Sequence, residues 1–161
     1  MAIGADDVGL PLKEVLGAHV RALGYSLVDY GCYPAGPSAR SDVDDYPDVA
    51  ERVALAIAEG RHALGILVCG TGIGMAIAAN KVPGVRAAQA HDTYSAERAR
   101  RSNDAQIVTL GARVIGPELA KSVVTTWLAA EFAGESSPSF GKVRKLIKID
   151  AKYREHREDT P

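Results

Sequence analysis

Short apolar runs alternate with segments of helical character along the whole chain, and this alternation constrains the fold more than any other feature. Pro11 and Pro47 stand where a first helical turn tolerates proline, and Gly24 and Gly60 can end a helix in a left-handed conformation. Strands joined by helices form a parallel sheet with both faces covered. The sequence therefore predicts an α/β fold whose five strands cover residues 1–5, 26–30, 64–69, 85–90 and 106–110.

Helical spacing predicts which side of each helix faces the sheet. Between Pro47 and Glu59, three apolar residues recur on one face, namely Val49, Val53 and Ile57. The first helix is expected to bury a stripe that consists of Leu12, Val15, Leu16 and Leu23, with His19 beside it as a packing residue. Further helices are expected after Gly72, Thr93 and Gly116.

The C-terminal segment, residues 138–158, is predicted to be an amphipathic helix. From residue 142 onward there are seven Lys and Arg against four Asp and Glu, so this tail carries +3 and the rest of the chain −4. Its apolar positions are Val143, Leu146, Ile147 and Tyr153. Such a helix packs on its own domain or crosses to a partner subunit. With 161 residues in total, we expect a single domain, residues 1–161.

Composition argues against several classes of protein. The 19 Lys and Arg offset 20 Asp and Glu, whereas a domain that binds nucleic acid is usually basic. The two cysteines, Cys32 and Cys69, are too few for a disulfide scaffold and indicate a reduced, cytoplasmic setting. Because no apolar run approaches the roughly 18 residues that span a bilayer, no membrane association is expected.

The run from Cys69 to Gly74, Cys-Gly-Thr-Gly-Ile-Gly, is the most informative motif, since ligands gather beyond the carboxyl ends of parallel strands. Its glycines allow a tight turn whose amides face an anion, and the helix that follows adds the positive end of its dipole. A helix N-terminus also stabilises a thiolate over a thiol. The alternative is a tight turn that contains a buried structural cysteine.

Spacing tests two familiar loops against this motif. A phosphatase loop needs an arginine six residues after the cysteine, where this chain has Met75. A dinucleotide-binding loop reads Gly-x-Gly-x-x-Gly, whereas the glycines here are Gly70, Gly72 and Gly74. Asp92 nevertheless stands at about the distance of that loop's ribose-binding acid. An NAD-linked oxidoreductase is therefore kept as a rival class.

Other polar residues lie next to predicted strands. Asp6 and Asp7 can orient sugar hydroxyls, move a proton or cap the first helix. Arg113 suits a phosphate because its planar fork donates two hydrogen bonds at once, although a solvated charge is the simpler account. Residues 102–104, Ser-Asn-Asp, are candidates for a site or for a turn. No metal site is predicted, because metal-ligand spacing is lacking among His19, His62, His91 and His156.

Together these stretches resemble the family of ribose-5-phosphate isomerase B and galactose-6-phosphate isomerase. The matching segments are residues 4–9, 45–47, 68–74, 78–86, 94–95, 102–104 and 111–116. The resemblance implies a Rossmann-like three-layer α/β/α sandwich with a five-stranded parallel sheet. It also implies a homodimer or a dimer of dimers, in which the C-terminal helix crosses to the partner subunit and the active sites are shared.

The activity that the resemblance implies is aldose–ketose isomerisation of a sugar phosphate through a cis-enediolate, without metal or cofactor. Cys69 would move the proton between C1 and C2, and Thr71 with the amides of Gly70 to Gly74 would stabilise the enediolate oxygens. Asp6 would bind sugar hydroxyls, and Asn103 would act from the partner subunit. Arg113 would hold the phosphate, helped across the dimer by Lys142 and Arg144. The remaining expected substrate contacts are Asp7, Tyr46, His91 and Ser102.

Two positions depart from the family's pattern. The family has Asp-His where this chain has Asp6-Asp7, and His-Asn where it has Ser102-Asn103. The second histidine is the one credited with opening the furanose ring of a pentose phosphate. A tetrose 4-phosphate cannot close that ring because its C4 oxygen carries the phosphate, and the pattern resembles family members that act on D-erythrulose 4-phosphate.

We therefore expect the pair D-erythrulose 4-phosphate and D-erythrose 4-phosphate as the preferred substrates. The alternative is ribose 5-phosphate and ribulose 5-phosphate, with His91 or a water in place of the missing imidazole. A non-catalytic sugar-phosphate-binding module is the rival of another class. Binding alone needs no thiol, so the presence of Cys69 beside Thr71 favours the enzyme.

Overall fold

The computed structural model describes residues 1–31 and 45–158, with side chains through residue 153. Its elements are β1 (Ala2–Ala5), α1 (Leu10–Ala22), β2 (Val28–Asp29), α2 (Tyr46–Ala58), β3 (Gly65–Cys69), α3 (Ile73–Ala79), β4 (Ala87–Gln89), α4 (Thr93–Asn103), β5 (Ile107–Gly111), α5 (Pro117–Ala129), the 3-10 turn η1 (Gly134–Ser136) and α6 (Phe140–Glu158). The predicted alternation of strands and helices is confirmed. Cys32 lies outside the described residues.

All five strands are parallel and form one sheet in the order β2-β1-β3-β5-β4. The chain leaves β1 toward one edge, through β2, and then returns to β3 and continues toward the other edge. The register places Ala5 beside Val68 and Cys69 beside Gly111, so three central strands end together. The carboxyl ends of β1 and β3 therefore flank the point at which the strand order reverses, where sheets of this kind bind ligands.

The two edge strands are shorter than predicted. The sequence predicts strands over residues 26–30 and 85–90, but β2 covers only Val28–Asp29 and β4 only Ala87–Gln89. Each of them pairs with a single neighbour, and Val28 is exposed. The three central strands, which pair on both sides, match the predicted bounds to within one residue.

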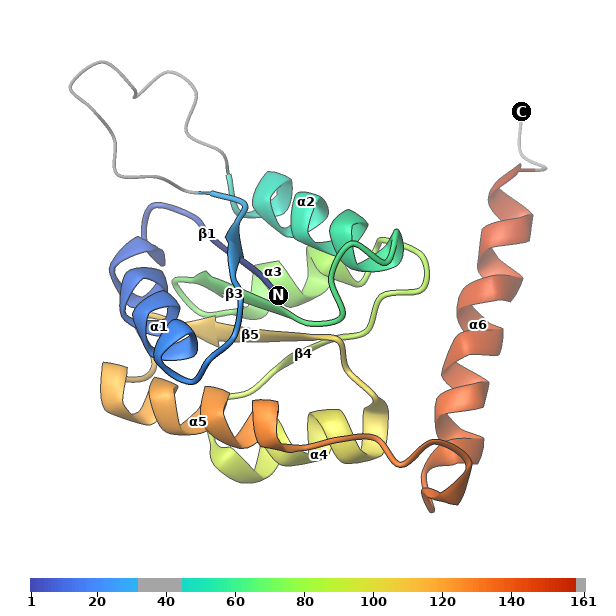
Figure 1. The fold of residues 1–161 in the computed structure, drawn as a ribbon. Helices are drawn as coiled ribbons and strands as arrows, with labels where there is room; N and C mark the ends of the chain where they lie inside the picture. The colour runs from blue at the N-terminus through green and yellow to red at the C-terminus, as the bar shows by residue number, and fades with distance from the viewer. Residues whose placement is uncertain (32–44, 159–161) are drawn as a thin grey trace.

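Helices cover both faces of the sheet, which makes the predicted three-layer sandwich (Figure 1). One apolar cluster joins α2 and α3 to the sheet, and in it Val49, Val53 and Ile57 are buried as predicted. The other cluster joins α1, α4 and α5 to the opposite face and contains Trp127, which is fully buried. Both clusters include residues of β1, β3 and β5, and β3 is the middle strand of the five.

The buried face of α1 is rotated from the predicted stripe. Leu12 and Leu16 are buried, but Val15 and Leu23 are 36% and 43% exposed. The buried face includes Lys13 instead, whose Nζ lies 2.7 Å from Asp29 Oδ2. The ion pair with the end of β2 draws a charged residue into the interface, which apolar periodicity alone does not predict. His19 is half-buried, and its Nε2 lies 2.8 Å from Thr125 Oγ1 on α5.

The C-terminal helix is present as predicted, but most of its predicted apolar stripe is uncovered. Val143 is buried, whereas Leu146, Ile147 and Tyr153 are 42%, 49% and 58% exposed. Figure 1 shows α6 standing to one side of the sandwich, with its first turns near α4 and η1. Farther along, Asp150 Oδ2 accepts a hydrogen bond from the amide of Gly84 at 2.7 Å.

We predict that Gly9→Ala destabilises the protein by about 1–3 kcal/mol or more, because an added Cβ would lie 2.3 Å from the carbonyl oxygen of Val68. The carbonyl oxygen and carbon of Val68 that the Cβ would meet belong to the backbone of β3, so α1 has to move away from β3. Gly17→Ala in the same helix is the control, because its Cβ would meet only flexible side-chain ends at 3.3 Å and beyond. Urea unfolding of both variants checks this, and equal stability of the Gly9→Ala variant and the wild type would contradict it.

Candidate active site

The carboxyl edge of the sheet brings together most of the residues expected in the site. Asp6 follows β1, Cys69 ends β3 and Arg113 follows β5. Tyr46, the first residue of α2, lies over Gly74, where an added Cβ would be 2.5–2.9 Å from its ring. These residues surround the point at which the strand order reverses.

The turn after β3 has the geometry that its glycines predict. Gly72 adopts φ +79°, a left-handed conformation that favours glycine, and α3 begins at Ile73. The amide of Gly72 donates to Cys69 Sγ at 3.1 Å, and the amide of Ile73 donates to Thr71 Oγ1 at 3.3 Å. Cys69 is 5% exposed, whereas Thr71 beside it is exposed. The sulfur thus sits at the base of the turn and receives a backbone donor.

The exits of β3 and β5 are joined by hydrogen bonds. The amide of Ala112 donates to the carbonyl of Cys69 at 2.8 Å, and the amide of Arg113 donates to the carbonyl of Gly70 at 3.0 Å. Among the described residues, the amides of Gly70 and Thr71 find no hydrogen-bond acceptor. Both amides remain able to donate to a ligand above the turn, and the Arg113 side chain lies over Gly70, 3.6 Å from where a Cβ would be.

Asp6 is a half-buried acid that faces a basic residue. Its Oδ1 accepts a hydrogen bond from the amide of Gly9 at 2.8 Å. Burial raises the pKa of Asp6, and the charge of Asp7 raises it further, while the bond from Gly9 and the charge of Arg113 oppose that rise. Asp7 is exposed, and its Oδ1 accepts from the amide of Val8 at 2.8 Å. Both acids therefore bond the backbone of the turn that leads into α1.

His91 holds the sheet edge through one ring nitrogen. Its Nε2 accepts a hydrogen bond from the amide of Gly111 at 2.9 Å, which requires that nitrogen to be unprotonated. Burial lowers the pKa of His91, although Asp92 opposes this. The next residue, Asp92, caps α4 by accepting from the amide of Ser95 at 2.7 Å, and this bonding lowers the pKa of Asp92. Asp92 therefore caps α4, at the position where a dinucleotide-binding loop would have its ribose-binding acid.

Four expected site residues lie away from Cys69 within one chain. Ser102 and Asn103 end α4, and that end precedes β5, at the amino edge of the sheet. Lys142 and Arg144 are exposed on α6, where the Arg144 guanidinium lies 5.8 Å from the ring centre of Phe140. The fold of a single chain therefore separates these residues from the carboxyl edge.

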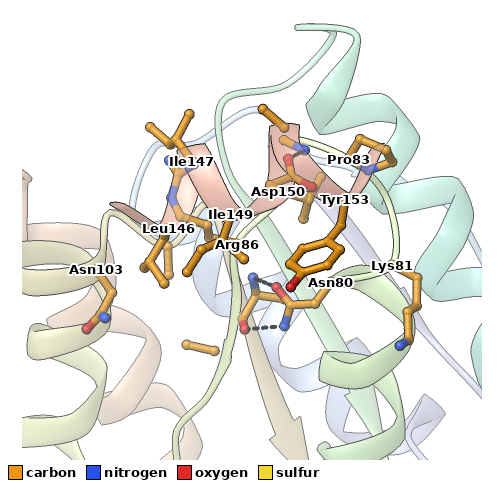
Figure 2. A pocket seen from close by; sticks show the side chains of 16 residues that line it. Asn80, Lys81, Pro83, Arg86, Asn103, Leu146, Ile147, Ile149, Asp150 and Tyr153 are labelled. Atoms are coloured by element: carbon orange, nitrogen blue, oxygen red, sulfur yellow. Dashed lines mark hydrogen bonds between the residues drawn. The ribbon is translucent and has the colours of Figure 1, made fainter. Parts of the chain in front are cut away.

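A large cavity lies near this second group rather than beside Cys69. It is a groove of about 760 Å³ between α6 and the body, with Asn103 in its lining. Figure 2 shows Tyr153 directed from α6 toward Asn80, whose side-chain amide pairs with the backbone of Ala87 at 2.8 and 2.9 Å. Arg86 forms an ion pair at 2.7 Å with Asp104, the residue that follows Asn103. This ion pair fixes the end of α4.

Sequence reasoning missed Gln89 and Thr109, whose side chains contact the turn from neighbouring strands. Gln89 Nε2 donates to the carbonyl of Thr71 at 2.6 Å, and Thr109 Oγ1 donates to the carbonyl of Gly72 at 2.8 Å. A threonine within the apolar run of β5 was the available signal, because a buried hydroxyl needs a partner. The identity of that partner depends on which strand lies alongside.

The described part of the chain contains no group of three or more His, Cys, Asp or Glu side chains placed to hold a metal ion. Over the same residues, none of the helices combines the length and the apolar character needed to cross a bilayer.

Comparison with known proteins identifies relatives along nearly the whole chain. A family model described as ribose/galactose isomerase matches residues 1–146. A D-erythrulose-4-phosphate isomerase from Pectobacterium atrosepticum is 51% identical over 98% of this chain and 96% of its own length. A ribose-5-P isomerase B from Listeria innocua is 47% identical over 96% of this chain and 99% of its own. The structure of Clostridium thermocellum ribose-5-phosphate isomerase B superposes with a TM-score of 0.85 at 41% identity, covering 94% of this chain and 97% of that one.

We predict that Asp6→Asn stabilises the folded protein at neutral pH. Since the pKa of Asp6 is raised above its ordinary 3.8, the folded state holds the proton more tightly than the unfolded state, and stability falls as pH rises through that window. Asparagine is neutral and keeps the oxygen that accepts from Gly9. Urea unfolding at neutral pH and below pH 3.8 should show a gain at neutral pH that vanishes in acid. A loss of equal size at both pH values would contradict this.

Proposed function

The chain belongs to the ribose/galactose isomerase family, and we propose that it interconverts D-erythrulose 4-phosphate and D-erythrose 4-phosphate through a cis-enediolate. It is a sugar-phosphate isomerase by its relatives, which carry isomerase names over nearly its whole length. The observation that carries the mechanism is the position of Cys69 Sγ, at the edge that also holds Asp6 and Arg113. It lies in a turn whose amides at Gly70 and Thr71 have no acceptor among the described residues.

In the proposed mechanism, the Cys69 thiolate removes a proton from C1 of the ketose. The electrons of the broken C–H bond form a C1–C2 double bond, and the C2 oxygen takes the negative charge. A proton moves from the C1 oxygen to the C2 oxygen, and the thiol returns its proton to C2, which leaves an aldehyde at C1. C1 is oxidised from an alcohol to an aldehyde while C2 is reduced from a ketone to an alcohol. The two changes cancel within the substrate, so the reaction needs no external electron acceptor.

The turn supplies the stabilisation that this intermediate needs. The amides of Gly70 and Thr71 face the developing negative oxygens as oxyanion donors, with the amide of Gly74 and the Thr71 hydroxyl beside them. Asp6 binds the sugar hydroxyls, and Arg113 holds the phosphate through its planar fork. Tyr46, which lies over Gly74, Asp7 and His91 complete the substrate contacts on this side.

The preference for a four-carbon substrate rests on Ser102. In the family's pattern, the histidine that opens a furanose ring stands at this position, and a tetrose 4-phosphate has no such ring to open. His91, the imidazole at the carboxyl edge, does not replace this histidine, because its Nε2 already accepts a hydrogen bond from the amide of Gly111. The relative from Pectobacterium, which is named for this substrate, supports the same proposal.

We propose further that two copies of the chain share their active sites. Asn103 lies at the amino edge of its own sheet, so it reaches a Cys69 turn only in the partner subunit. The exposed apolar side chains of α6, Leu146, Ile147 and Ile149, form the surface that the second copy covers. Lys142 and Arg144 on the same helix then add positive charge near the partner's phosphate. A working thiolate requires a reducing compartment, which fits a cytoplasmic protein.

A substrate panel tests the proposed reaction. We expect a higher kcat/KM on D-erythrulose 4-phosphate than on ribose 5-phosphate or a six-carbon sugar phosphate, because Ser102 cannot assist ring opening. Coupled assays of each interconversion measure this. A clear preference for ribose 5-phosphate would reject the tetrose proposal and favour the pentose alternative.

Substitution of the two cysteines tests the mechanism. We expect Cys69→Ala to lower kcat by about 10²- to 10⁴-fold, the usual contribution of a positioned acid–base group, with little change in substrate affinity. Cys32→Ala is the matched control and should retain activity. Normal turnover by the Cys69→Ala variant would exclude the proposed base, and binding without turnover in the wild type would indicate the non-catalytic module.

Mixed dimers test the shared site. The variants Cys69→Ala and Asn103→Ala should each be inactive or nearly so as homodimers. A heterodimer of the two, purified with two different tags, combines the intact Cys69 with the intact Asn103 in one of its two sites, so about half of the wild-type activity per dimer should return. If the heterodimer is no more active than its parents, Asn103 does not act across the interface.

A further inference from the structure

Two side chains from neighbouring strands hold the carbonyl groups of the Cys69 turn. Gln89, at the end of β4, donates from Nε2 to the carbonyl of Thr71 at 2.6 Å. Thr109, in the middle of β5, donates from Oγ1 to the carbonyl of Gly72 at 2.8 Å. The two residues lie in different strands, yet they contact successive peptide units of the same turn.

The opposite side of each peptide unit faces a functional atom. A trans peptide is planar, and its C=O and N–H point in opposite directions. The peptide whose carbonyl meets Gln89 directs the amide of Gly72 at Cys69 Sγ, 3.1 Å away. The peptide whose carbonyl meets Thr109 directs the amide of Ile73 at Thr71 Oγ1, 3.3 Å away. Fixing each carbonyl therefore fixes a donor on the sulfur or on the hydroxyl.

We propose that Gln89 and Thr109 are positioning residues that set, through these two peptide planes, how strongly the turn stabilises the Cys69 thiolate and orients the Thr71 hydroxyl. This rests on the proposed function of Cys69 as the base. A hydrogen bond accepted by the carbonyl also polarises the peptide and strengthens its amide as a donor. The effect is largest when the sulfur is charged, because donors to a charged acceptor are the stronger ones.

The environments of the two side chains fit this role. Thr109 is as fully buried as the apolar residues beside it in β5, and its hydroxyl donates its hydrogen bond to the turn. Gln89 is exposed, so its side chain gains little from burial. Its short hydrogen bond to Thr71 is the one that its side chain makes to the described residues. A purely structural role would require only that the turn stay folded, whereas a positioning role requires that the thiolate respond to each donor.

The experiment compares Gln89→Met and Gln89→Glu with Thr109→Val in a Cys32→Ala background. Met and Glu keep the approximate size of the side chain and remove the donor, and Val removes only the hydroxyl. Thr126→Val is the matched control, because Thr126 Oγ1 bonds the carbonyl of Ser122 within α5 at 2.9 Å. Two quantities are measured: the pH midpoint of the acid limb of kcat/KM, and the pH midpoint of thiolate formation by ultraviolet absorbance.

We expect both midpoints to move upward by roughly half to one pH unit in Gln89→Met, which is about a three- to tenfold loss of thiolate stabilisation and corresponds to one hydrogen bond. Gln89→Glu should move them at least as far, because its charge opposes the thiolate. Thr109→Val should lower kcat at neutral pH more than it changes KM. The peptide that Thr109 holds carries the Ile73 amide, and that amide donates to the Thr71 hydroxyl. Thr126→Val should leave all these values unchanged.

Unchanged midpoints in both Gln89 variants would overturn the proposal, whatever happens to their stability. Gln89 is exposed, so its variants are expected to fold even if Thr109→Val does not. If the wild type isomerises no sugar phosphate, the proposed function fails on its own. The thiolate titration needs no turnover, and it would still show whether Gln89 controls the sulfur.

Discussion

The turn after β3 depends on close backbone contacts at two glycines. Gly72 lies in the left-handed region, and a Cβ there would be 3.0 Å from the backbone of Leu110. Gly111 lies against the backbone of Thr71, where a Cβ would be 2.7–2.8 Å from its atoms. Without side chains at these positions, the exits of β3 and β5 approach closely enough to share hydrogen bonds. That approach brings Arg113 over Gly70, where two amides of the turn have no acceptor in the part of the chain that the structure describes.

Asp6, the half-buried acid at this edge, is placed where burial disfavours its charged form. Burial raises the pKa of Asp6, so the folded state holds the charged form at a disadvantage. The bond from Gly9 and the charge of Arg113 offset that disadvantage only in part. A carboxyl group whose charge is disfavoured by burial fits the proposed role of Asp6 in binding the sugar hydroxyls. The charge of the exposed Asp7 raises the pKa of Asp6 further. Among the described residues, Asp7 itself accepts a hydrogen bond only from the backbone of its own turn.

The sequence predicts features set by local chemistry and fails where distant contacts decide. Apolar strands, prolines at helix starts and glycines at helix ends are local signals, and the parallel sheet and the Cys69 turn follow from them. The buried face of α1 is different, because Lys13 is drawn inward by Asp29 from another element. The contacts of Gln89 and Thr109 are also decided by distant elements. Which carbonyl each side chain reaches depends on the strand order, and neither strand's own sequence determines that order. The lengths of β2 and β4 likewise depend on their being edge strands.

One arrangement accounts for two features that a single chain leaves unexplained. Asn103 stands with Ser102 at the amino edge of the sheet, whereas Asp6, Cys69 and Arg113 stand at the carboxyl edge. In addition, α6 presents large apolar side chains to solvent. A two-fold axis makes the same contact twice. If one copy covers the α6 of its partner, the partner therefore covers the α6 of the first copy with the same surface. Such an axis can also place the amino edge of one sheet against the carboxyl edge of the other. The ion pair between Arg86 and Asp104 holds the backbone next to Asn103, so that this side chain is presented from a fixed helix end. In the proposed dimer, apolar burial on α6 therefore provides the binding energy, while the rigid end of α4 provides the residue that completes the site.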